Sequence, residues 1–356
     1  MTKEYIRHLL NLGEKNIQKL IVTIVCNVDG LTNNFVNYTK DSVESEFLTV
    51  EQYELILSSL RNRGFETNSY FDEDKFMTDY LTNKFYVQKG KQNLIMNSAQ
   101  KGIAVGRKSL IPAFCDLYGI WHNNSDAYTV SLCRNKFHLY CILSQLGFPR
   151  PKSWLYNFKN GGWLNGKSPE HGREIIAKLN YETSSIGLSE KNILIMSKDA
   201  EEYIKYLSIN YNQAIIVQDF ICGYEVEVPV ILSKNNFVLD AMCVVHNKKP
   251  YIGNVILDYD IRKYHDYEYS SFDSIDILKC KELKDTALKI ATFLNISGLG
   301  RIDFRLDNDK NIYITDIATN PGISKYTATY NAIKQFGYSY EDMLCFLIGM
   351  TIDKYS

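Results

Sequence analysis

The chain has 356 residues, a length that favours two or three domains with a sizeable core. Its 40 basic and 41 acidic side chains give a net charge of −1, which argues against a general nucleic-acid or membrane-surface binder. Small molecules are then the expected partners. The hydrophobic content of 45% is that of a folded globular protein.

The eight cysteines contain no Cys-x-x-Cys pair, so neither a zinc site nor a disulfide framework is expected. The first strong apolar run, residues 20–26, is short and strand-like rather than the core of a signal peptide. No window reaches the roughly 18 apolar residues of a membrane span. We therefore expect a cytoplasmic protein without nucleic-acid or membrane partners.

The first third alternates strand and helix patterns. Residues 20–26 (LIVTIVC) form a β-branched run typical of a strand covered on both faces. A helix is predicted over 49–63, capped by Thr49 with Gln52 three residues on and stopped by Gly64. Further strands are expected at 66–70 and 93–97, and further helices at 107–118 and 134–146. This order predicts a parallel sheet.

The second half has a different texture. Residues 161–172 (GGWLNGKSPEHG) read as a surface loop before a short strand at 175–178. Strand-like runs then follow too closely for βαβ units, which indicates antiparallel pairing, at 214–218, 225–232 and 237–245. The remaining expected elements are a helix at 281–294, strands at 299–306 and 311–317, and a helix capped by Ser339.

Residues 298–322 carry the strongest local signal. Period two places Arg301, Asp303 and Arg305 on one face of a strand, opposite Ile302, Phe304 and Leu306. A turn returns the chain as a hairpin, so that Asp316 can face Asp303, and paired carboxylates suit Mg²⁺. A solvated, ion-paired hairpin is the commoner origin of such a pattern. The Thr-Asn-Pro-Gly turn at 319–322, which brings backbone N–H groups beside the carboxylates, favours a site.

Two other segments have weaker signals. In 175–189 a strand ends at Lys178 and is followed by small hydroxyl residues and Gly187, which suits phosphate oxygens; a plain surface loop is at least as common a reading. No Walker or dinucleotide glycine motif is present. In 214–231 the linker after Gln218, with Glu225 beyond it, suits an adenine edge and a ribose, although a simple strand connection explains it equally well.

In their order along the chain these segments resemble the ATP-grasp fold and, within it, the D-alanine:D-alanine ligase family from about residue 20 onward. Lys178 and the 182–187 loop (ETSSIG) are similar to the family's lysine and Glu-Gly-Ser-Ser-x-Gly loop. Gly300 to Asp303 and Asp316 to Gly322 resemble Gly-Arg-x-Asp and Glu-x-Asn-x-x-Pro-Gly. Residues 97–132 are similar to the family's N-terminal segment, and Arg134-Asn135-Lys136 stands where the family has Met-Asp-Lys.

The resemblance implies an N-terminal parallel α/β domain at 1–124 and two α+β domains, at 125–217 and 218–356, that sandwich ATP. It implies phosphate contacts from Lys136, Lys178 and the 182–189 loop, adenine contacts from Gln218 and the backbone beside it, and ribose contacts from Glu225. The implied ATP-binding residues are Lys136, Lys178, Glu182, Ser184, Ser185, Gln218, Asp219, Ile221, Glu225 and Lys263. The implied Mg²⁺ ligands are Asp303, Asp316 and Asn320.

The resemblance also implies a two-step reaction. A carboxylate attacks the γ-phosphorus to give an acyl phosphate, and an amine then displaces phosphate to leave an amide. Arg301 and the N–H of Gly322 would stabilise the oxyanion. The other residues implied in catalysis or substrate binding are Ser184, Glu46, Tyr264 in a mobile lid at 258–264, Thr327 and Ala328.

Several departures from the family pattern indicate a divergent member. Ala318 stands where the family has a metal-ligating asparagine, and Asn320 is the candidate replacement. Glu46, and less securely Glu44, is the candidate for the glutamate that binds the first amino acid. We therefore expect a ligase that joins an amino acid or similar carboxylate to an amine. The alternatives are a true D-alanine:D-alanine ligase, a nucleotide-binding pseudoenzyme and a carboxylate kinase; a homodimer is also open.

Overall fold

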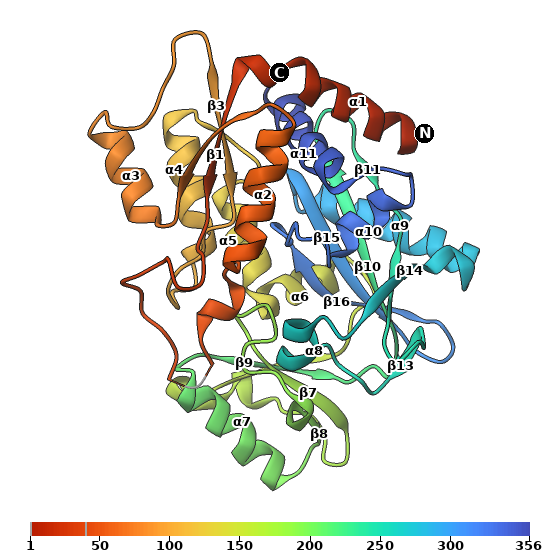
Figure 1. The fold of residues 1–356 in the computed structure, drawn as a ribbon. Coiled ribbons are helices and arrows are strands. Elements are labelled where there is room, and N and C mark those ends of the chain that lie inside the picture. The colour runs from red at the N-terminus through yellow and green to blue at the C-terminus, as the bar shows by residue number, and fades with distance from the viewer. Residues whose placement is uncertain (1, 40) are drawn as a thin grey trace.

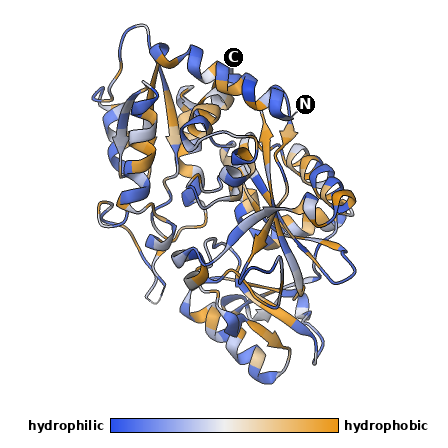
Figure 2. Ribbon diagram, turned by 45° about the vertical axis from the view of Figure 1, so that its right-hand side comes forward, coloured by the Kyte–Doolittle hydropathy of each residue, from blue (hydrophilic) through white to orange (hydrophobic). Residues whose placement is uncertain are grey.

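The computed structural model describes residues 2–39 and 41–356, apart from the side chains of Tyr259, Asp260 and Lys263. Three sheets follow one another along the chain (Figure 1). Hydrophobic residues concentrate on the strands, while the helices alternate between hydrophobic and hydrophilic (Figure 2). Within the described residues, no helix combines the length and apolarity needed to cross a membrane. The domain boundaries drawn from the sequence stay a prediction.

The N-terminal sheet is parallel, as predicted, with the order β2-β1-β3-β4. Its strands are β1 (Leu20–Val25), β2 (Glu66–Tyr70), β3 (Gln92–Asn97) and β4 (Trp121–His122). The helices between them are α2 (Val50–Asn62), α3 (Glu73–Leu81) and α4 (Leu110–Tyr118). The predicted cap of α2 is confirmed, because Thr49 and Gln52 form a reciprocal capping box.

The middle sheet is antiparallel, with the order β6-β5-β9-β7-β8. Its strands are β5 (Ser153–Asn157), β6 (Gly162–Trp163), β7 (Glu174–Leu179), β8 (Ile193–Ile195) and β9 (Ile215–Asp219), and α7 (Lys198–Asn210) covers its outer face (Figure 1). The reading of 161–172 as a plain loop was wrong in part. Trp163 pairs with Tyr156, and their rings pack 5.2 Å apart, which orders β6.

The C-terminal sheet is also antiparallel, with β14-β12-β10-β15-β16 as its main path. Its strands are β10 (Gly223–Leu232), β11 (Phe237–Val238), β12 (Met242–Val245), β13 (Tyr251–Gly253), β14 (Glu268–Ser271), β15 (Gly298–Leu306) and β16 (Ile312–Ala318). The single strand expected over 237–245 breaks at Asp240, whose carboxylate is held by Ser271 and Lys284. Ile302, Phe304 and Leu306 are fully buried, as the alternation predicted.

Helices connect and cover these sheets. The C-terminal helices are α9 (Ile277–Phe293), α10 (Ala328–Lys334) and α11 (Tyr340–Tyr355), and the predicted Ser339 cap of α11 is confirmed. The helix expected over 134–146 is confirmed as α6 (Lys136–Gln145), and a further helix, α5 (Ala127–Arg134), precedes it and meets it at Asn135. Asn135 ends the first helix and caps the second, so Lys136 becomes the first residue of α6.

Helix α1 (Thr2–Lys15) packs along α11 through two glycines (Figure 1). A Cβ added at Gly349 would lie 1.8 Å from the carbonyl oxygen of Leu9, a distance no real Cβ reaches. Gly349→Ala is therefore expected to push α1 away and to lower the free energy of unfolding by about 3 kcal/mol. Denaturant unfolding measures the change. The control Gly106→Ala, whose Cβ would meet only Ser109 Oγ at 3.6 Å, should cost far less; equal losses would contradict this packing.

His122 is expected to make the stability of the fold depend on pH. Its side chain is fully buried, its Nε2 lies 2.9 Å from Asp116 Oδ1, and its Nδ1 has no hydrogen-bond partner. Burial, with the nearby Lys354, lowers the pKa of His122 to about 4. Between pH 6.5 and 4 the unfolded chain therefore binds a proton that the native chain does not, so stability is lost as the pH falls.

The expected loss across this window is on the order of 3 kcal/mol. Denaturant unfolding between pH 7 and 4.5 should show a slope in the natural protein that His122→Gln largely removes. His171→Gln, at an exposed position, should keep the slope. Equal slopes in the natural protein and His122→Gln would assign the acid sensitivity to other groups.

Candidate active site

A cavity of about 370 Å³ lies where the three sheets meet. Its walls include Met96 of β3, Lys178 of β7, Glu225 of β10, Asp303 of β15 and Asp316 of β16. Most of the residues predicted from the sequence line it, namely Glu46, Lys136, Lys178, Glu182, Ser184, Ser185, Gln218, Asp219, Ile221, Glu225, Arg301, Asp303, Asp316, Asn320, Gly322 and Thr327. Segments far apart in sequence thus converge on one space.

Two lysines stand on one wall of the cavity. Lys178 forms no hydrogen bond or ion pair that engages its Nζ among the described residues, and burial lowers its pKa to about 8 against the opposing field of Asp316. Lys136 donates from Nζ to the carbonyl oxygen of Glu182 at 2.6 Å and lies 3.6 Å from Asp316 Oδ1. Both ammonium groups are partly desolvated by burial, so they would attract an anion bound here more strongly than exposed lysines would.

The loop after β7 has an unusual backbone. Ser184 and Ser185 have positive φ values of 51° and 59°, in the left-handed region that side chains other than glycine rarely adopt. Such conformations concentrate in ligand clamps and switches. Ser185 Oγ donates to the carbonyl oxygen of Leu257 at 2.5 Å, which ties this loop to the segment preceding α8 (Tyr259–Tyr264).

The β9 to β10 connection forms the opposite end of the cavity. Gln218 is buried and donates from Nε2 to Ser153 Oγ at 3.1 Å. Asp219 binds Arg173 through both carboxylate oxygens, so it offers the cavity its backbone rather than its charge. Glu225 accepts one hydrogen bond from Arg305 at 3.1 Å.

Arg305 was given no role from the sequence, although its position on the polar face of β15 was correctly predicted. Its guanidinium donates to the carbonyl oxygens of Ile221, Gly253 and Val255. It thereby fixes the connection beside Gln218 to the start of the lid. These carbonyl oxygens belong to segments at least 50 residues before Arg305, so the sequence alone does not reveal that they meet it.

Three carboxylates lie in a row across neighbouring strands, because Glu227 pairs in register with Asp303, and Asp303 with Asp316. Arg301 grips both oxygens of Asp303 at 2.7 Å and lies 3.2 Å from Glu227 Oε2. Burial raises the pKa of Asp303 to about 7, partly offset by Arg301. Lys136 and Lys178 lower the pKa of Asp316 although burial opposes them.

Glu227 was given no role from the sequence, although its position carries a signal. It lies two residues after Glu225 on the same strand, so period two puts both on one face. Its side chain is fully buried, it accepts a hydrogen bond from Tyr269 at 2.7 Å, and its Oε1 has no hydrogen-bond partner.

Asn320 lies on the cavity wall near Ala318, which contributes no side-chain oxygen. Its Nδ2 donates to the carbonyl oxygen of Asn97 at 3.1 Å, and this bond fixes the orientation of the amide. Thr327 caps α10 by accepting from the N–H of Tyr330 and also lines the cavity. Ala328, the second predicted substrate contact, has a side chain buried in the core and is not part of the cavity wall.

Glu46 lies at the N-terminal end of the cavity in a cluster that we call the buried charge cluster: Glu46, Arg107, Lys108, Arg134 and Glu182. Arg107 contacts Glu46 at 3.0 Å and Glu182 at 2.7 Å, and Arg134 contacts Glu182 at 3.0 Å. The three cations could not be assigned to this cluster from the sequence, because their acidic partners are distant in the chain: Glu182, for example, lies 75 residues from Arg107. The Glu182 carboxylate is thus paired with arginines and does not face Lys136 or Lys178.

The predicted lid is helical. Tyr264 of α8 has an exposed fraction of 71% and is not among the residues lining the cavity. The side chain of Lys263 lies outside the described residues. The next residue, His265, stacks on Tyr326 with ring centroids 3.7 Å apart, and Tyr326 does line the cavity. The contact joins the lid segment to the loop that carries Gly322.

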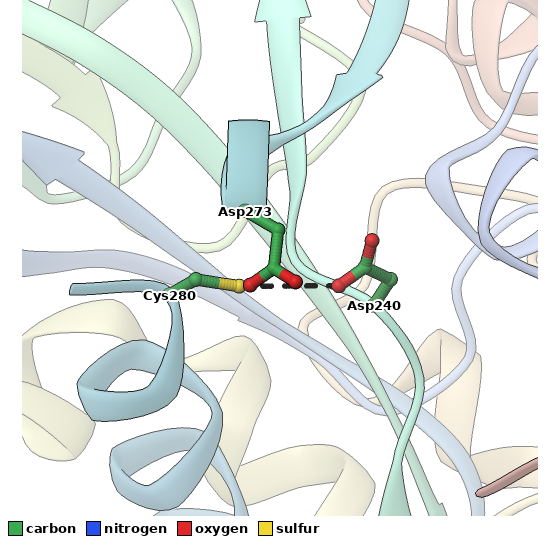
Figure 3. Close-up of side chains that lie close together, drawn as sticks. All are labelled: Asp240, Asp273 and Cys280. Carbon is green, nitrogen blue, oxygen red and sulfur yellow. Dashed lines mark hydrogen bonds between the residues drawn. The ribbon is translucent and has the colours of Figure 1, made fainter. Parts of the chain in front are cut away.

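One further group of ligand-type side chains lies elsewhere, formed by Asp240, Asp273 and Cys280 (Figure 3). Lys284 Nζ lies 2.8 Å from Asp240 Oδ1 and supplies the positive charge that a metal would otherwise bring. The cluster is explained by this ion pair.

The arrangement of the three sheets is the ATP-grasp fold, and the cavity between them places Lys136 and Lys178 opposite the row of carboxylates. A family model described as the D-ala D-ala ligase C-terminus matches residues 167–349. The chain belongs to this ligase family, so the expected fold class and enzyme class are confirmed.

Relatives and solved structures agree with this assignment. The D-alanine–D-alanine ligase of Paraburkholderia phytofirmans is 23% identical over 324 residues, covering 88% of this chain and 94% of its own. Ligase B of Clostridium tetani is 24% identical over 268 residues, covering 70% and 68%. The Bacillus anthracis ligase structure has a TM-score of 0.67 at 12% identity, covering 94% and 97%. The VanG D-Ala:D-Ser ligase of Enterococcus faecalis has a TM-score of 0.66 at 17% identity, covering 94% and 100%.

Proposed function

We propose that the protein joins a carboxylate to an amine at the expense of ATP, through an acyl phosphate, and releases ADP and phosphate. The observation that carries the proposal is the shared cavity, in which Lys136 and Lys178 face Asp303 and Asp316 with Arg301 beside them. Such a site can hold a polyphosphate and a divalent cation together and can neutralise charge that develops during transfer.

The two ends of the cavity suit the two parts of ATP, the phosphates at one end and the adenine with its ribose at the other. Lys136 and Lys178 would bind its phosphates, and the strained loop at Ser184 and Ser185 would present backbone N–H groups to them. The Gln218 amide and the Ile221 backbone would meet the adenine edge, and the oxygen of Glu225 not used by Arg305 would accept from the ribose hydroxyls.

Magnesium fits the acidic row. The buried Asp303, the half-buried Asp316 and the amide of Asn320 bring side-chain oxygens to this row, and Mg²⁺ prefers oxygen ligands of this kind. Glu227 adds a third carboxylate to this row, and its Oε1 accepts no hydrogen bond and lies 4.0 Å from Arg262. When bound, the ion would neutralise charge on the phosphates being transferred.

The proposed reaction needs no protein nucleophile. An oxygen of the donor carboxylate attacks the γ-phosphorus while the bond to the ADP oxygen breaks, and the amine then attacks the acyl carbon while phosphate leaves. Lys136 and Lys178 hold the phosphates in line, and Arg301 with the N–H of Gly322 stabilises the oxyanion of the second step. Arg301 is itself held in place by Asp303 and Glu227.

Ala318 motivates a second candidate, a pseudoenzyme that binds nucleotide without turnover. The intact arrangement of Arg301, Asp303 and Asp316 speaks against it, because binding alone does not require an arginine beside the acidic row. A carboxylate kinase that stops at the acyl phosphate is the third candidate. Literal D-alanine:D-alanine ligase activity is one case of the main proposal.

An ADP-release screen tests these candidates. Purified protein, ATP and Mg²⁺ are mixed with D- and L-amino acids and simple dicarboxylates, singly and in pairs with amines, and products are identified by mass spectrometry. ADP and phosphate formed only with both substrates support the ligase. Formation of AMP and pyrophosphate contradicts it. ADP formed without an amine, with an acyl phosphate trapped by hydroxylamine, would identify the kinase, and nucleotide binding without any turnover would identify the pseudoenzyme.

A further inference from the structure

The buried charge cluster is not balanced. It contains three cations, Arg107, Lys108 and Arg134, and two carboxylates, Glu46 and Glu182. Four of these side chains are at most 3% exposed, whereas Lys108 is 21% exposed and lines the cavity. With all three cations protonated the cluster carries one surplus positive charge, and its most accessible member is Lys108. Burial, together with Arg134, lowers the pKa of Lys108 to about 7, so an anion bound beside it would favour the charged form.

The carboxylate of Glu46 is already paired with cations of the protein, so it does not offer a binding site for a substrate ammonium group. This carboxylate lies 3.0 Å from Arg107, 3.6 Å from Lys108 and 3.7 Å from Arg134, and it accepts a hydrogen bond from Thr183. Although burial alone would raise it, these cations hold the pKa of Glu46 well below its usual value. An ammonium group placed here would be repelled by three positive charges rather than attracted by one negative charge.

Neighbouring groups do not cancel the surplus. Tyr38 donates to Glu182 Oε1 at 2.7 Å and carries no charge itself, since burial raises its pKa. Lys136 contacts the Glu182 carbonyl oxygen, but its charge is paired with Asp316 at 3.6 Å, so it neither adds to the surplus nor removes it. Gln100, on the same wall, keeps a buried Oε1 without a hydrogen-bond partner, so the wall offers one neutral acceptor for an N–H beside the cationic Lys108.

An unbalanced buried charge is costly unless a ligand compensates for it. We propose that the carboxylate substrate is acidic: a second carboxylate on the acyl donor, as in a dicarboxylic amino acid, pairs with Lys108. The inference rests on the proposed ligase function and names its donor class. The competing role for Lys108, suggested by its 2.8 Å contact with Thr183 in the phosphate loop, is binding of the ATP γ-phosphate.

The first test needs no variant. Each dicarboxylic amino acid is compared with its amide, aspartate with asparagine and glutamate with glutamine, in both stereochemical forms and with the same amine and ATP. We expect kcat/KM to be about 100-fold higher for the acid, the size of one close charge pair in a desolvated site. ADP formation that prefers alanine or the amides would overturn the inference while leaving the ligase proposal intact.

Lys108→Met provides the second test. Its removal leaves two arginines facing two glutamates, so the cluster should still fold. The acid-to-amide ratio should fall toward one through a higher KM for the acid, with the KM for ATP unchanged. Lys101→Met is the matched control, because Lys101 pairs with Asp72 and Asp74 and does not line the cavity. A raised KM for ATP with an unchanged donor KM would assign Lys108 to the nucleotide instead.

Binding gives a readout that does not depend on turnover. Calorimetric titration of glutarate into the natural protein should show binding that Lys108→Met weakens at least 10-fold and Lys101→Met leaves unchanged. Absence of Lys108-dependent binding would overturn the inference even if no amine substrate is found. Absence of ADP formation with every donor would instead count against the ligase proposal, so the two failures are distinguishable.

Discussion

Lys178→Met is expected to lower kcat/KM by about 10³-fold, the size of effect seen when one preorganised electrostatic group is removed from a transfer site. Lys178 lines the cavity with an ammonium group that no carboxylate of the described chain pairs within 4 Å. Methionine keeps most of the side-chain volume and removes the charge. The measurement is steady-state ADP release, with the nucleotide affinity determined separately by calorimetry.

Lys191→Met is the matched control, since Lys191 follows the same strand and loop but is exposed in the short 3-10 helix (Glu190–Asn192) that precedes β8. It should keep full activity. A melting temperature within a few degrees of the natural protein is required of both variants, so that loss of activity is not loss of folding. Unchanged activity in Lys178→Met would show that the phosphates bind elsewhere.

Asp303→Asn is expected to lower kcat by a similar factor, about 10³-fold. The amide has the shape of the carboxylate but not its charge, so it weakens the cation site. It also removes one of the two hydrogen bonds that Arg301 donates to this side chain, because an amide nitrogen cannot accept one. Both proposed roles are needed in the transition state rather than for nucleotide binding. We therefore expect kcat to fall more than the ATP affinity, and more Mg²⁺ to be needed for half-maximal rate.

The control is Asp309→Asn, in the exposed turn between β15 and β16. It changes charge on the same hairpin and should alter neither kcat nor the Mg²⁺ requirement. An Asp303→Asn enzyme with normal kcat and normal Mg²⁺ dependence would move the cation site away from the Asp303 and Asp316 pair.

Local patterns predicted most of the fold. The parallel order at 20–97, the cap at Thr49, the alternation over 301–306 and the cap at Ser339 all depend on residues close together in sequence, and the structure confirms them. The errors fall where a distant contact decided the local structure. The packing of Trp163 on Tyr156 made a strand of a predicted loop, and the bonds of Asp240 to Ser271 and Lys284 broke a predicted strand.

The same division applies to the site. Local sequence patterns predicted which residue types gather, because period two and turn spacing fix these relations between near neighbours. They placed Lys178 at a strand end, Asp303 opposite Asp316 across a hairpin, and Gln218 and Glu225 on either side of a short linker. The groups that surround these residues depend on the tertiary fold. It brought Arg107, Lys108 and Arg134 onto Glu46 and set Glu227 beside Asp303. Electrostatic interactions depend on distance in space and on burial rather than on position in the chain, so the net charge of −1 gave no sign of a cationic wall at one end of the cavity.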